Sequence, residues 1–253
     1  MEHILVEHQA DITIITMAHA RRRNALSEAH LRELDTALED AAASSARGVI
    51  IAAQGPVYSS GHDFGDMIDR DLAAMQTLLG LCREVMQRIP TMPQPVIAQV
   101  QGTAMAAGCQ LVASADMAVA AASATFVVPG GKGGWFCTTP GVALARAVGR
   151  KRAIEMLFTG DPIDAHMAAE WGLVNRVVPD DELVEATMEL MRRATRGSAA
   201  SKAIGKRAFY RQVDLDLARA YDYATEVMAS SSQLPAAREK MSAFIEKRRP
   251  VFD

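Results

Sequence analysis

The stretch from Gln101 to Ala120, QGTAMAAGCQLVASADMAVA, places a run of small residues directly before one amide side chain, Gln110. The small residues are Ala104, Ala106, Ala107, Gly108 and Cys109. They fall between an expected strand and an expected helix, so no bulky side chain covers the N–H groups at the start of that helix. Such N–H groups attract negative charge. The turn therefore predicts a place for an oxygen atom that carries or gains negative charge.

A second turn of the same kind, YSSGHD over 58–63, follows the strand expected over 48–53. Two such turns, each after a buried strand, can bring two N–H groups to a single oxygen. That arrangement is an oxyanion hole for a carbonyl that becomes an enolate or a tetrahedral species, and each donor is typically worth about 3–4 kcal/mol to a transition state. Two well-packed turns without a chemical role are the alternative that the residues alone leave open.

Motifs of several other enzyme classes are missing from the sequence. No GxGxxG follows a strand, and GGKGG over 130–134 has neither that spacing nor the Gly-Lys-Ser/Thr of a phosphate loop. No GxSxG marks an esterase nucleophile. The histidines never take HExxH or Cys/His zinc spacing, so no metal site is expected.

The composition is that of an ordinary soluble globular protein, with 253 residues, 49% of them hydrophobic and 23% charged. A net charge of -3 gives no bulk attraction to nucleic acid or to anionic lipid. No apolar run approaches the roughly 18 residues of a membrane span, so neither nucleic acid nor membrane is an expected partner. Three cysteines are too few for a disulfide framework, and the start of the chain reads as folded protein, which together predict a cytoplasmic location.

Hydrophobic periodicity predicts strands followed by a mostly helical C-terminal part. The expected strands are 4–6, 12–17, 48–53, 96–100, 117–121 and 125–128, with helices over about 27–43 and 72–89. From Pro140 onward nearly everything is expected to be helical, and 173–178 is the one strand candidate there. The fold class is therefore α/β with a helical C-terminal region, divided into a core of 1–195 and a helical part of 196–253.

Five segments together resemble the crotonase (enoyl-CoA hydratase/isomerase) superfamily over essentially the whole chain. They are RRRNALS, YSSGHDFGDM, VQGTAMAAGCQLVASADMAVA, LARAVGRKRAIEMLFTGDPIDAHMAAEWGLVNRVVP and FIEKRRPVF. Within the superfamily, SSGHDF, AAGCQLVAS and FCTTPGVALARAV are similar to one particular branch. The resemblance implies a spiral of ββα units whose C-terminal helices pack on a neighbouring subunit, in a homotrimer or a dimer of trimers. It also implies an acyl-CoA thioester partner, with coenzyme A as part of the substrate and no permanently bound cofactor.

The resemblance assigns the two oxyanion donors to the backbone N–H groups of His62 and Ala107, where the family usually has Gly at the second position. It further implies a set of residues around coenzyme A and the acyl group: Arg23, Ala25, Leu26, Ser60, Asp63, Phe64, Trp135 and Lys247. Arg22 or Arg23 would meet the phosphates, and Phe136 would help Trp135 to wall the acyl pocket. Lys247 and Arg248 stand where the family uses a cation near the 3′-phosphate, on the same or the next subunit.

Two glutamates that hydratases of the family use are replaced here, by Gln110 and Gly130. An amide holds water by hydrogen bonds but transfers no proton near neutral pH. Since general acid–base help is worth about 10²–10⁴-fold per group, ordinary hydration is not expected to be efficient. A third family position for a carboxylate matches Cys137, which is either a thiol with a lowered pKa at a helix start or a small buried hydrophobe. Asp66 is expected to be a helix cap.

The family label is enoyl-CoA hydratase, with lyase or isomerase chemistry through a stabilised enolate and a place in fatty acid metabolism. One hypothesis is a working enzyme that uses Gln110, Cys137 or a group on the substrate itself. A second is a non-catalytic acyl-CoA-binding or regulatory protein. A third is an assembly partner for another trimer of the family.

Overall fold

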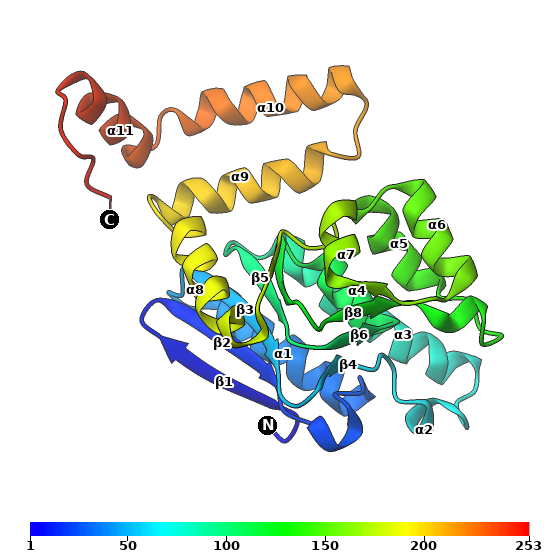
Figure 1. Cartoon of the computed structure of the whole chain (residues 1–253). Coiled ribbons are helices and arrows are strands. Elements are labelled where there is room, and N and C mark those ends of the chain that lie inside the picture. The colour runs from blue at the N-terminus through cyan, green and yellow to red at the C-terminus, as the bar shows by residue number, and fades with distance from the viewer. Residues whose placement is uncertain (253) are drawn as a thin grey trace.

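The computed structural model describes residues 1–252, and its larger sheet has six strands in the order β1-β2-β3-β5-β7-β10 (Figure 1). The strands are β1 Ile4–Gln9, β2 Ile12–Met17, β3 Gly48–Ala53, β5 Val96–Val100, β7 Met117–Ala121 and β10 Arg176–Val178. β1 pairs with β2 in antiparallel fashion, and all other neighbours in this sheet are parallel. The central strands are continuous apolar runs because both faces of a parallel sheet are covered.

A smaller sheet has four strands in the order β4-β6-β8-β9. They are β4 Val57–Ser59, β6 Thr103–Met105, β8 Thr125–Val127 and β9 Ile163–Asp164. The chain enters the two sheets alternately, as β3 then β4, β5 then β6, and β7 then β8, with helices after each pair. This alternation is the ββα spiral that the resemblance implied, and the α/β fold class is confirmed.

Eleven α-helices complete the described chain. They are α1 Glu28–Ala43, α2 Phe64–Met67, α3 Leu72–Thr91, α4 Ala107–Ser114, α5 Thr138–Ala147, α6 Arg150–Thr159, α7 Ala165–Trp171, α8 Leu183–Ala194, α9 Ala199–Gln212, α10 Leu217–Ser231 and α11 Pro235–Ile245. α1 lies within the helix expected over about 27–43, and its cap is Ser27, which accepts a hydrogen bond from the N–H of His30. No helix within residues 1–252 combines the length and the apolar character needed to cross a membrane.

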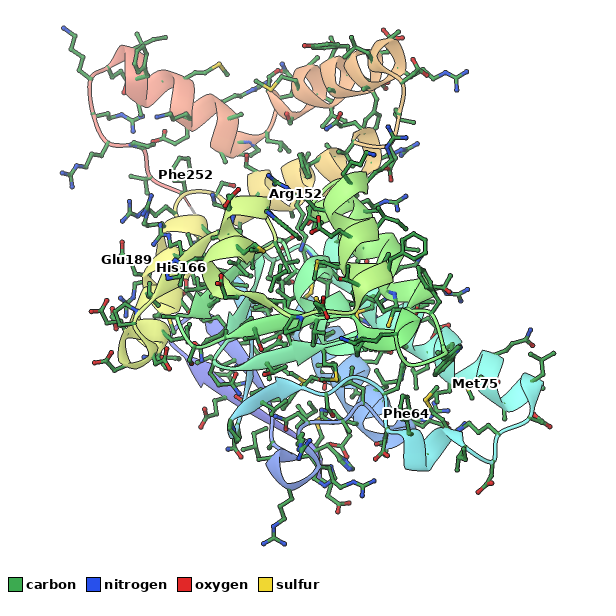
Figure 2. All side chains as sticks on the ribbon, turned by 45° about the vertical axis from the view of Figure 1, so that its right-hand side comes forward. Phe64, Met75, Arg152, His166, Glu189 and Phe252 are labelled. Carbon is green, nitrogen blue, oxygen red and sulfur yellow. The ribbon has the colours of Figure 1, made fainter. Side chains whose placement is uncertain are left out.

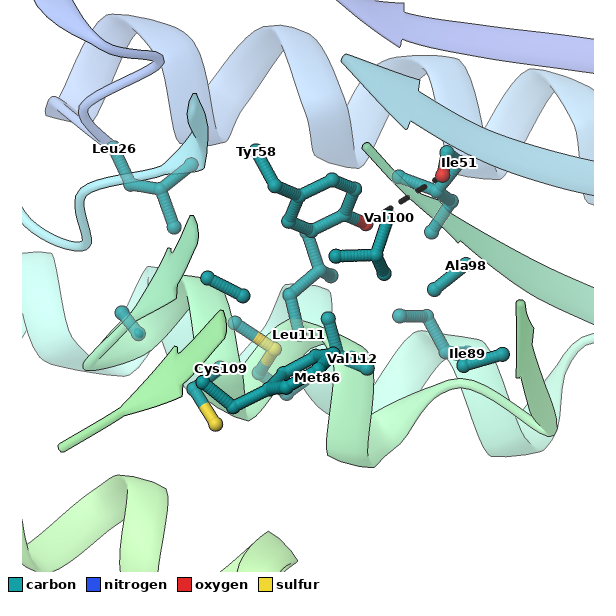
Figure 3. Close-up of a cluster of buried hydrophobic side chains, with 14 of the residues drawn as sticks. Leu26, Ile51, Tyr58, Met86, Ile89, Ala98, Val100, Cys109, Leu111 and Val112 are labelled. Atoms are coloured by element: carbon teal, nitrogen blue, oxygen red, sulfur yellow. Dashed lines mark hydrogen bonds between the residues drawn. The ribbon is translucent and has the colours of Figure 1, made fainter. Parts of the chain in front are cut away.

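Alternate residues of the central strands enter two different cores, as the period of two in a strand requires. Ile51 packs with α1 and α3, in the cluster that also holds Tyr58 and Leu111 (Figure 3). Its neighbour Ile50 packs on the opposite face of the sheet with Met191 of α8. The six-stranded sheet is therefore a filled middle layer, and the turns that leave it are supported from both sides.

Three of the four short strands of the second sheet were not predicted, whereas β8 lies within the strand expected over 125–128. β4, β6 and β9 have only two or three residues each, which is too short for a period of two to be recognised. The expectation of one strand after Pro140 was wrong, because β9 pairs there with β8. Of the strand expected over 173–178, only Arg176–Val178 pairs in the sheet.

The C-terminal helices leave the core as an extended arm (Figure 1). α9 is attached to the core by Lys206, whose Nζ lies 2.7 Å from Asp116 Oδ2 and donates to the carbonyl oxygens of Ile89 and Gln94. The hydroxyl of Tyr210 donates to the other oxygen of Asp116 at 2.8 Å. α10 and α11 lie beyond this attachment. The division between 1–195 and 196–253 stays a prediction.

Candidate functional site

The two turns that lack large side chains follow two neighbouring strands of the smaller sheet. β4 and β6 are parallel, with Ser59 opposite Ala104, so their carboxyl ends meet at the same edge. The sequence had placed the turns directly after β3 and β5, whereas these two short strands come between and bring the turns together. A methyl group added to Gly61 would lie 3.0 Å from Ala106 Cβ and 3.3 Å from Ala107 N. The structure therefore brings the second half of YSSGHD into contact with the start of α4.

The backbone at this contact is held in an uncommon conformation. Gly61 has a φ of 82°, and Ala106, which is not glycine, has a φ of 49°. Residues other than glycine rarely adopt a positive φ. This backbone conformation costs on the order of 1–3 kcal/mol of folding free energy, so the surrounding structure must hold it in place. The N–H of Ala106 donates to the carbonyl oxygen of Val127 in β8 at 2.8 Å, which helps to hold it. The N–H of Ala107 is thereby presented at the first position of α4.

Neither of the two predicted donor N–H groups is engaged within the described chain. Across residues 1–252, no acceptor takes a hydrogen bond from the backbone N–H of His62 or of Ala107. For Ala107 this follows from its place in the first turn of a helix, where N–H groups have no intrahelical partner. The two predicted oxyanion donors thus lie in adjacent, contacting turns with their hydrogen-bonding capacity unused.

The imidazole of His62 is mostly buried beside α1. Its Nδ1 lies 3.4 Å from the carbonyl oxygen of Leu26, and its Nε2 is buried with no hydrogen-bond partner in residues 1–252. Burial lowers the pKa of His62, against smaller opposing effects of the Leu26 carbonyl and the Asp66 carboxylate. The ring is therefore neutral near pH 7, and it adds no positive charge to the turn.

Gln110 lies in the first turn of α4, three residues after Ala107. The residue is 6% exposed, and its Oε1 is buried without a hydrogen-bond partner among the described residues. A buried unpaired amide oxygen costs about 1–3 kcal/mol, which a ligand or a bound water would recover. Gln110 is therefore equipped to hold a polar group but not to transfer its proton.

Gly130 and Cys137 contact each other across the loop between β8 and α5. The N–H of Trp135 donates to the carbonyl oxygen of Gly130 at 2.9 Å, which folds the loop back on itself. A methyl group on Gly130 would overlap the carbonyl oxygen of Trp135 and lie 2.6 Å from Cys137 Sγ. The loop therefore fills the space in which a side chain at position 130 would start.

The thiol of Cys137 does not have the lowered pKa that its place at a helix start had suggested. It caps α5 without a side-chain hydrogen bond to the helix, and burial raises its pKa, against the opposing effect of a hydrogen bond with the Gly130 backbone. Cys109, one helix away, has a pKa raised to about 12 by burial and by the nearby Cys137. Both sulfurs are therefore protonated near neutral pH, and neither acts there as a thiolate.

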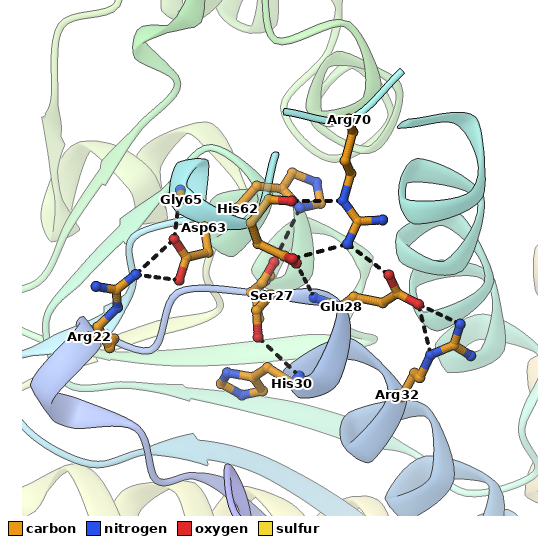
Figure 4. Close-up of polar contacts among 11 residues, drawn as sticks. Arg22, Ser27, Glu28, His30, Arg32, His62, Asp63, Gly65 and Arg70 are labelled. Atoms are coloured by element: carbon orange, nitrogen blue, oxygen red, sulfur yellow. Dashed lines mark hydrogen bonds and ion pairs between the residues drawn. The ribbon is translucent and has the colours of Figure 1, made fainter. Parts of the chain in front are cut away.

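The carboxylates of the first turn are already paired (Figure 4). Asp63 accepts from Arg22 at 2.9 Å and from the N–H of Gly65 at 2.9 Å. The Arg22 hydrogen bond is the largest of the effects that lower the pKa of Asp63. Asp66 accepts from the N–H of Glu28 and from Arg70, at 2.7 and 3.0 Å, and so caps α1. Neither acid is a free proton acceptor, and Arg22 is tied to Asp63.

The RRRNALS segment pairs with the turn that carries His62. The N–H of Leu26 donates to the carbonyl oxygen of Gly61 at 2.8 Å, and the N–H of Ser60 donates to the carbonyl oxygen of Arg23 at 3.0 Å. The side chain of Arg23 is exposed, whereas Ala25 and Leu26 are 8% and 0% exposed. Four predicted binding residues, Arg23, Ala25, Leu26 and Ser60, therefore lie together next to His62.

An aromatic side chain at the start of α2 meets one from the loop between β8 and α5. Phe64 is 70% exposed and Trp135 51% exposed, and their ring centroids lie 6.4 Å apart. Phe136 packs instead against Phe158 of α6, with centroids 5.7 Å apart. Figure 2 shows Phe64 at the end of the molecule away from Phe252 and the C-terminal arm. The structure thus groups Phe64 with Trp135 beside the predicted site.

Lys247 is not brought to this site within the chain. It follows α11 at the far end of the arm, away from α2 (Figure 1), and its side chain is exposed. Arg248 pairs with Glu239 and Glu246. Any contact of Lys247 with coenzyme A would have to involve another subunit. Residues 1–252 also hold no group of three or more His, Cys, Asp or Glu side chains arranged to hold a metal ion.

Comparison with known proteins gives a consistent result over almost the whole chain. The family model described as Enoyl-CoA hydratase/isomerase matches residues 7–253. Human enoyl-CoA hydratase domain-containing protein 3, mitochondrial, is 46% identical over 242 residues, which is 94% of this chain and 79% of the human protein. A crystal structure of an enoyl-CoA hydratase from Mycobacterium smegmatis superposes with a TM-score of 0.96 at 42% identity, covering 98% of both chains. The superfamily and the branch that the sequence segments resemble are confirmed.

The predicted cytoplasmic location is contradicted by these relatives. The human protein and its mouse counterpart, which is 44% identical over 248 residues and of which this chain covers 82%, are both named as mitochondrial. The prediction rested on few cysteines and on the start of the chain. A low cysteine count indicates a reducing compartment and does not distinguish one such compartment from another. The comparison points to mitochondria in place of the cytoplasm.

Proposed function

Because the chain belongs to the enoyl-CoA hydratase/isomerase family, we propose that it binds an acyl-CoA thioester between the N–H groups of His62 and Ala107. Their two hydrogen bonds would stabilise the negative charge that the thioester oxygen gains when an enolate forms. The observation that carries the proposal is the contact between the two turns, with Gly61 packed against Ala107 N and both N–H groups unused within residues 1–252.

The chemistry around this pair differs from that of a two-glutamate hydratase. Gln110 supplies an amide, Gly130 supplies no side chain, and the raised pKa of Cys137 keeps its thiol protonated. Asp63 and Asp66 are held by Arg22 and Arg70. Without a free carboxylate, addition of water to an enoyl group lacks its general base and acid, each worth about 10²–10⁴-fold. We therefore propose lyase or isomerase chemistry through the enolate, in which the substrate supplies the reacting acid or base.

A second candidate function is acyl-CoA binding without turnover, in a carrier or regulatory role. The engaged carboxylates beside His62 favour it, since Asp63 and Asp66 are each held in an ion pair or a helix cap. A site of this kind would keep its affinity for the thioester because hydrogen bonds to the ground-state carbonyl need no proton transfer.

We also propose that the chain assembles into a homotrimer or a dimer of trimers. The arm formed by α10 and α11 carries apolar side chains that its own core leaves uncovered. They include Leu217, Tyr221, Met228, Met241, Phe244 and Ile245, which are 50–79% exposed. Apolar surface on this scale is typical of a protein interface, and a neighbouring subunit would cover it.

Binding and turnover measured on one panel of thioesters test the two candidate functions. Enoyl-CoA, dienoyl-CoA and β-dicarbonyl-CoA esters are titrated calorimetrically and assayed for turnover, with free coenzyme A and free acids as controls. Enolate chemistry predicts binding of the ester and turnover of at least one class. Binding of esters without any turnover favours the second candidate. Absence of binding by every ester contradicts both.

A proline substitution tests the contribution of the Ala107 N–H. Ala107→Pro removes that N–H at the first position of α4. The residue before a proline avoids the backbone conformation that Ala106 holds, with φ 49° and ψ -113°, so the melting temperature is measured beside binding and turnover. Ala199→Pro removes an N–H at the first position of α9, where Ser198 already has an extended backbone, and is the control for the loss of an N–H alone. We expect the first variant to lose about 10²-fold or more in turnover or most of its ester affinity, and the second to keep both.

A further inference from the structure

Ser59, the last residue of β4, lies where the two turns meet. Its side chain is fully buried, and its hydroxyl donates to the carbonyl oxygen of Asn24 at 2.8 Å. The same hydroxyl oxygen accepts from the N–H of Gly61 at 3.2 Å. The single hydroxyl of Ser59 thus uses both its donor and one of its acceptor sites, the latter on the turn that carries His62. It fixes the residue directly before His62 to the RRRNALS segment.

The start of α4 contacts Ser59 from the other side. A methyl group on Gly108 would lie 2.6 Å from the carbonyl oxygen of Ser59, 2.7 Å from its Cβ and 3.0 Å from its Oγ. Gly108 directly follows Ala107, and Ala104 of β6 is the ladder partner of Ser59. The residue after the second donor therefore packs directly on the side chain that orients the first turn.

The acceptor of the Ser59 hydroxyl is itself held in place. Asn24 is fully buried with a φ of 50°, in the left-handed region that asparagine tolerates better than most residues. Its Nδ2 donates to the carbonyl oxygens of Gln54 and Val57, at 2.9 and 2.8 Å. The carbonyl oxygen of Asn24 is consequently a fixed point against which Ser59 sets the first turn.

We infer that Ser59 is a positioning residue that sets the separation and direction of the His62 and Ala107 N–H groups. The inference rests on the proposed function of those groups. Removing the hydroxyl frees Gly61 N and leaves the buried oxygen of Asn24 without its donor. The first turn is then free to shift relative to α4, although no atom that touches the thioester has changed. A displacement of about 1 Å in such a site costs about 10²-fold in rate.

The vibrational spectrum of the bound thioester reports this positioning directly. The carbonyl band of an acyl-CoA labelled with carbon-13 at the thioester carbon is compared, free and bound to the full chain, by infrared difference spectroscopy. Hydrogen bonds from two N–H groups lower the carbonyl frequency on binding. We expect Ser59→Ala to lose roughly half of that shift, while the dissociation constant changes less than about threefold.

Thr187→Val provides the matched control for stability. The hydroxyl of Thr187 is also fully buried and donates to a backbone carbonyl oxygen, that of Leu183 at 2.7 Å, but it lies in α8. We expect both variants to lower the melting temperature by similar amounts and only Ser59→Ala to alter the carbonyl band. Gly108→Ala adds a methyl group that overlaps Ser59 from the side of α4 and leaves the hydroxyl intact. We expect this variant to reduce the shift of the carbonyl frequency as well.

The outcomes separate this inference from the function on which it rests. A full carbonyl shift in both Ser59→Ala and Gly108→Ala, beside a full shift in the natural protein, overturns the role of Ser59 and leaves the proposed function standing. A natural protein that binds thioesters without any carbonyl shift, or binds none, overturns the two N–H groups as donors and the inference with them.

Discussion

The Sγ atom of Cys137 lies 2.6 Å from the place that a methyl group on Gly130 would occupy. The thiol and the carbonyl oxygen of Trp135 together close the space over Gly130. The loop up to residue 137 therefore occupies the space that a side chain at position 130 would need. The thiol that closes this space is protonated near neutral pH, since burial raises its pKa.

Gly130→Ala is expected to lower the free energy of unfolding by about 1–3 kcal/mol, since the added methyl overlaps a backbone atom that has little room to move. Gly130→Glu is expected to lower it at least as much and to gain no hydratase activity. Urea unfolding measures the first effect. Gly133→Ala is the control, because its methyl would meet its nearest neighbour, Pro129 O, at an ordinary 3.6 Å. Equal stability of the two alanine variants would contradict this reading of the loop.

Cys137 is expected to react slowly with iodoacetamide at pH 7 although it is the most accessible of the three cysteines. Burial raises its pKa, so the reactive thiolate is scarce until the pH passes the usual range of a thiol. The rate of alkylation, followed by mass spectrometry against pH, measures this. Cys137→Ala is the control that identifies the site. A thiol that is fully reactive at pH 7 would restore the hypothesis of an activated nucleophile.

The sequence predicted the long elements and the identity of the two turns, but not what brings the turns together. Ile12–Met17 and Gly48–Ala53 were expected with their observed bounds, since their apolar patterns run over six residues. β4 and β6 are three residues long and carry no such pattern. The sequence Tyr58-Ser59-Ser60 does not indicate that Ser59 is buried while its neighbour Ser60 is only partly so.

Chemical properties that depend on burial also escaped prediction. The position of Cys137 before a helix suggested a lowered pKa, because the helix dipole favours a thiolate. Desolvation outweighs that effect in the folded chain and raises the pKa. The ion pair of Arg22, one of the two arginines expected to meet the phosphates, with Asp63, which lies 41 positions later, was also not predicted. Such long-range pairs are set by the fold and have no local signature in the sequence.

Lys206→Met is expected to destabilise the chain by about 3–5 kcal/mol, because it leaves Asp116 half-buried without its cation. It also removes the donor to two backbone carbonyl oxygens. Thermal and urea unfolding measure the loss. Lys202→Met, one turn earlier in α9, removes a lysine without an ion pair in residues 1–252 and is expected to change stability by less than about 0.5 kcal/mol. Similar losses in both variants would contradict an anchoring role for Lys206.

Met228→Glu is expected to shift the proposed trimer or dimer of trimers toward monomer. Met228 in α10 is 76% exposed in the single chain, and burial of a charge in a subunit interface is costly. Light scattering coupled to size exclusion gives the mass. Val184→Glu changes a residue in α8 that is 65% exposed, and we expect it to leave the mass unchanged. A natural protein that elutes as a monomer at micromolar concentration would contradict the proposed interface.

The free energy of unfolding is expected to fall as the pH drops from 6.5 to 4, because of His30. This histidine is fully buried in α1, stacks against His3 at 5.5 Å between ring centroids, and has its Nδ1 3.0 Å from the carbonyl oxygen of Ala25. Burial lowers its pKa to about 4, with further lowering by His3 and His19 and opposing effects of the Ala25 carbonyl and the Glu33 carboxylate. Between these two pH values His30 binds a proton in the unfolded chain but stays neutral in the folded chain, so protonation favours unfolding.

The slope of stability against pH tests that expectation. A depression from 6.5 to about 4 corresponds to a loss of about 3 kcal/mol over the window, complete once the pH passes below the folded value. His30→Gln keeps a donor for the Ala25 carbonyl and does not titrate, so its slope is expected to be smaller by one proton. Burial raises the pKa of Glu33, but its hydrogen bonds with the Glu2 and His3 N–H groups outweigh that effect and lower the pKa to about 2. The contribution of Glu33 to stability is therefore lost only as the pH falls below 4.5. Urea titrations between pH 5 and 7 avoid the contribution of Glu33, and the comparison with His30→Gln separates His30 from His62, whose pKa is also lowered by burial. Equal slopes for the natural chain and His30→Gln in this range would show that His30 is protonated in the folded state.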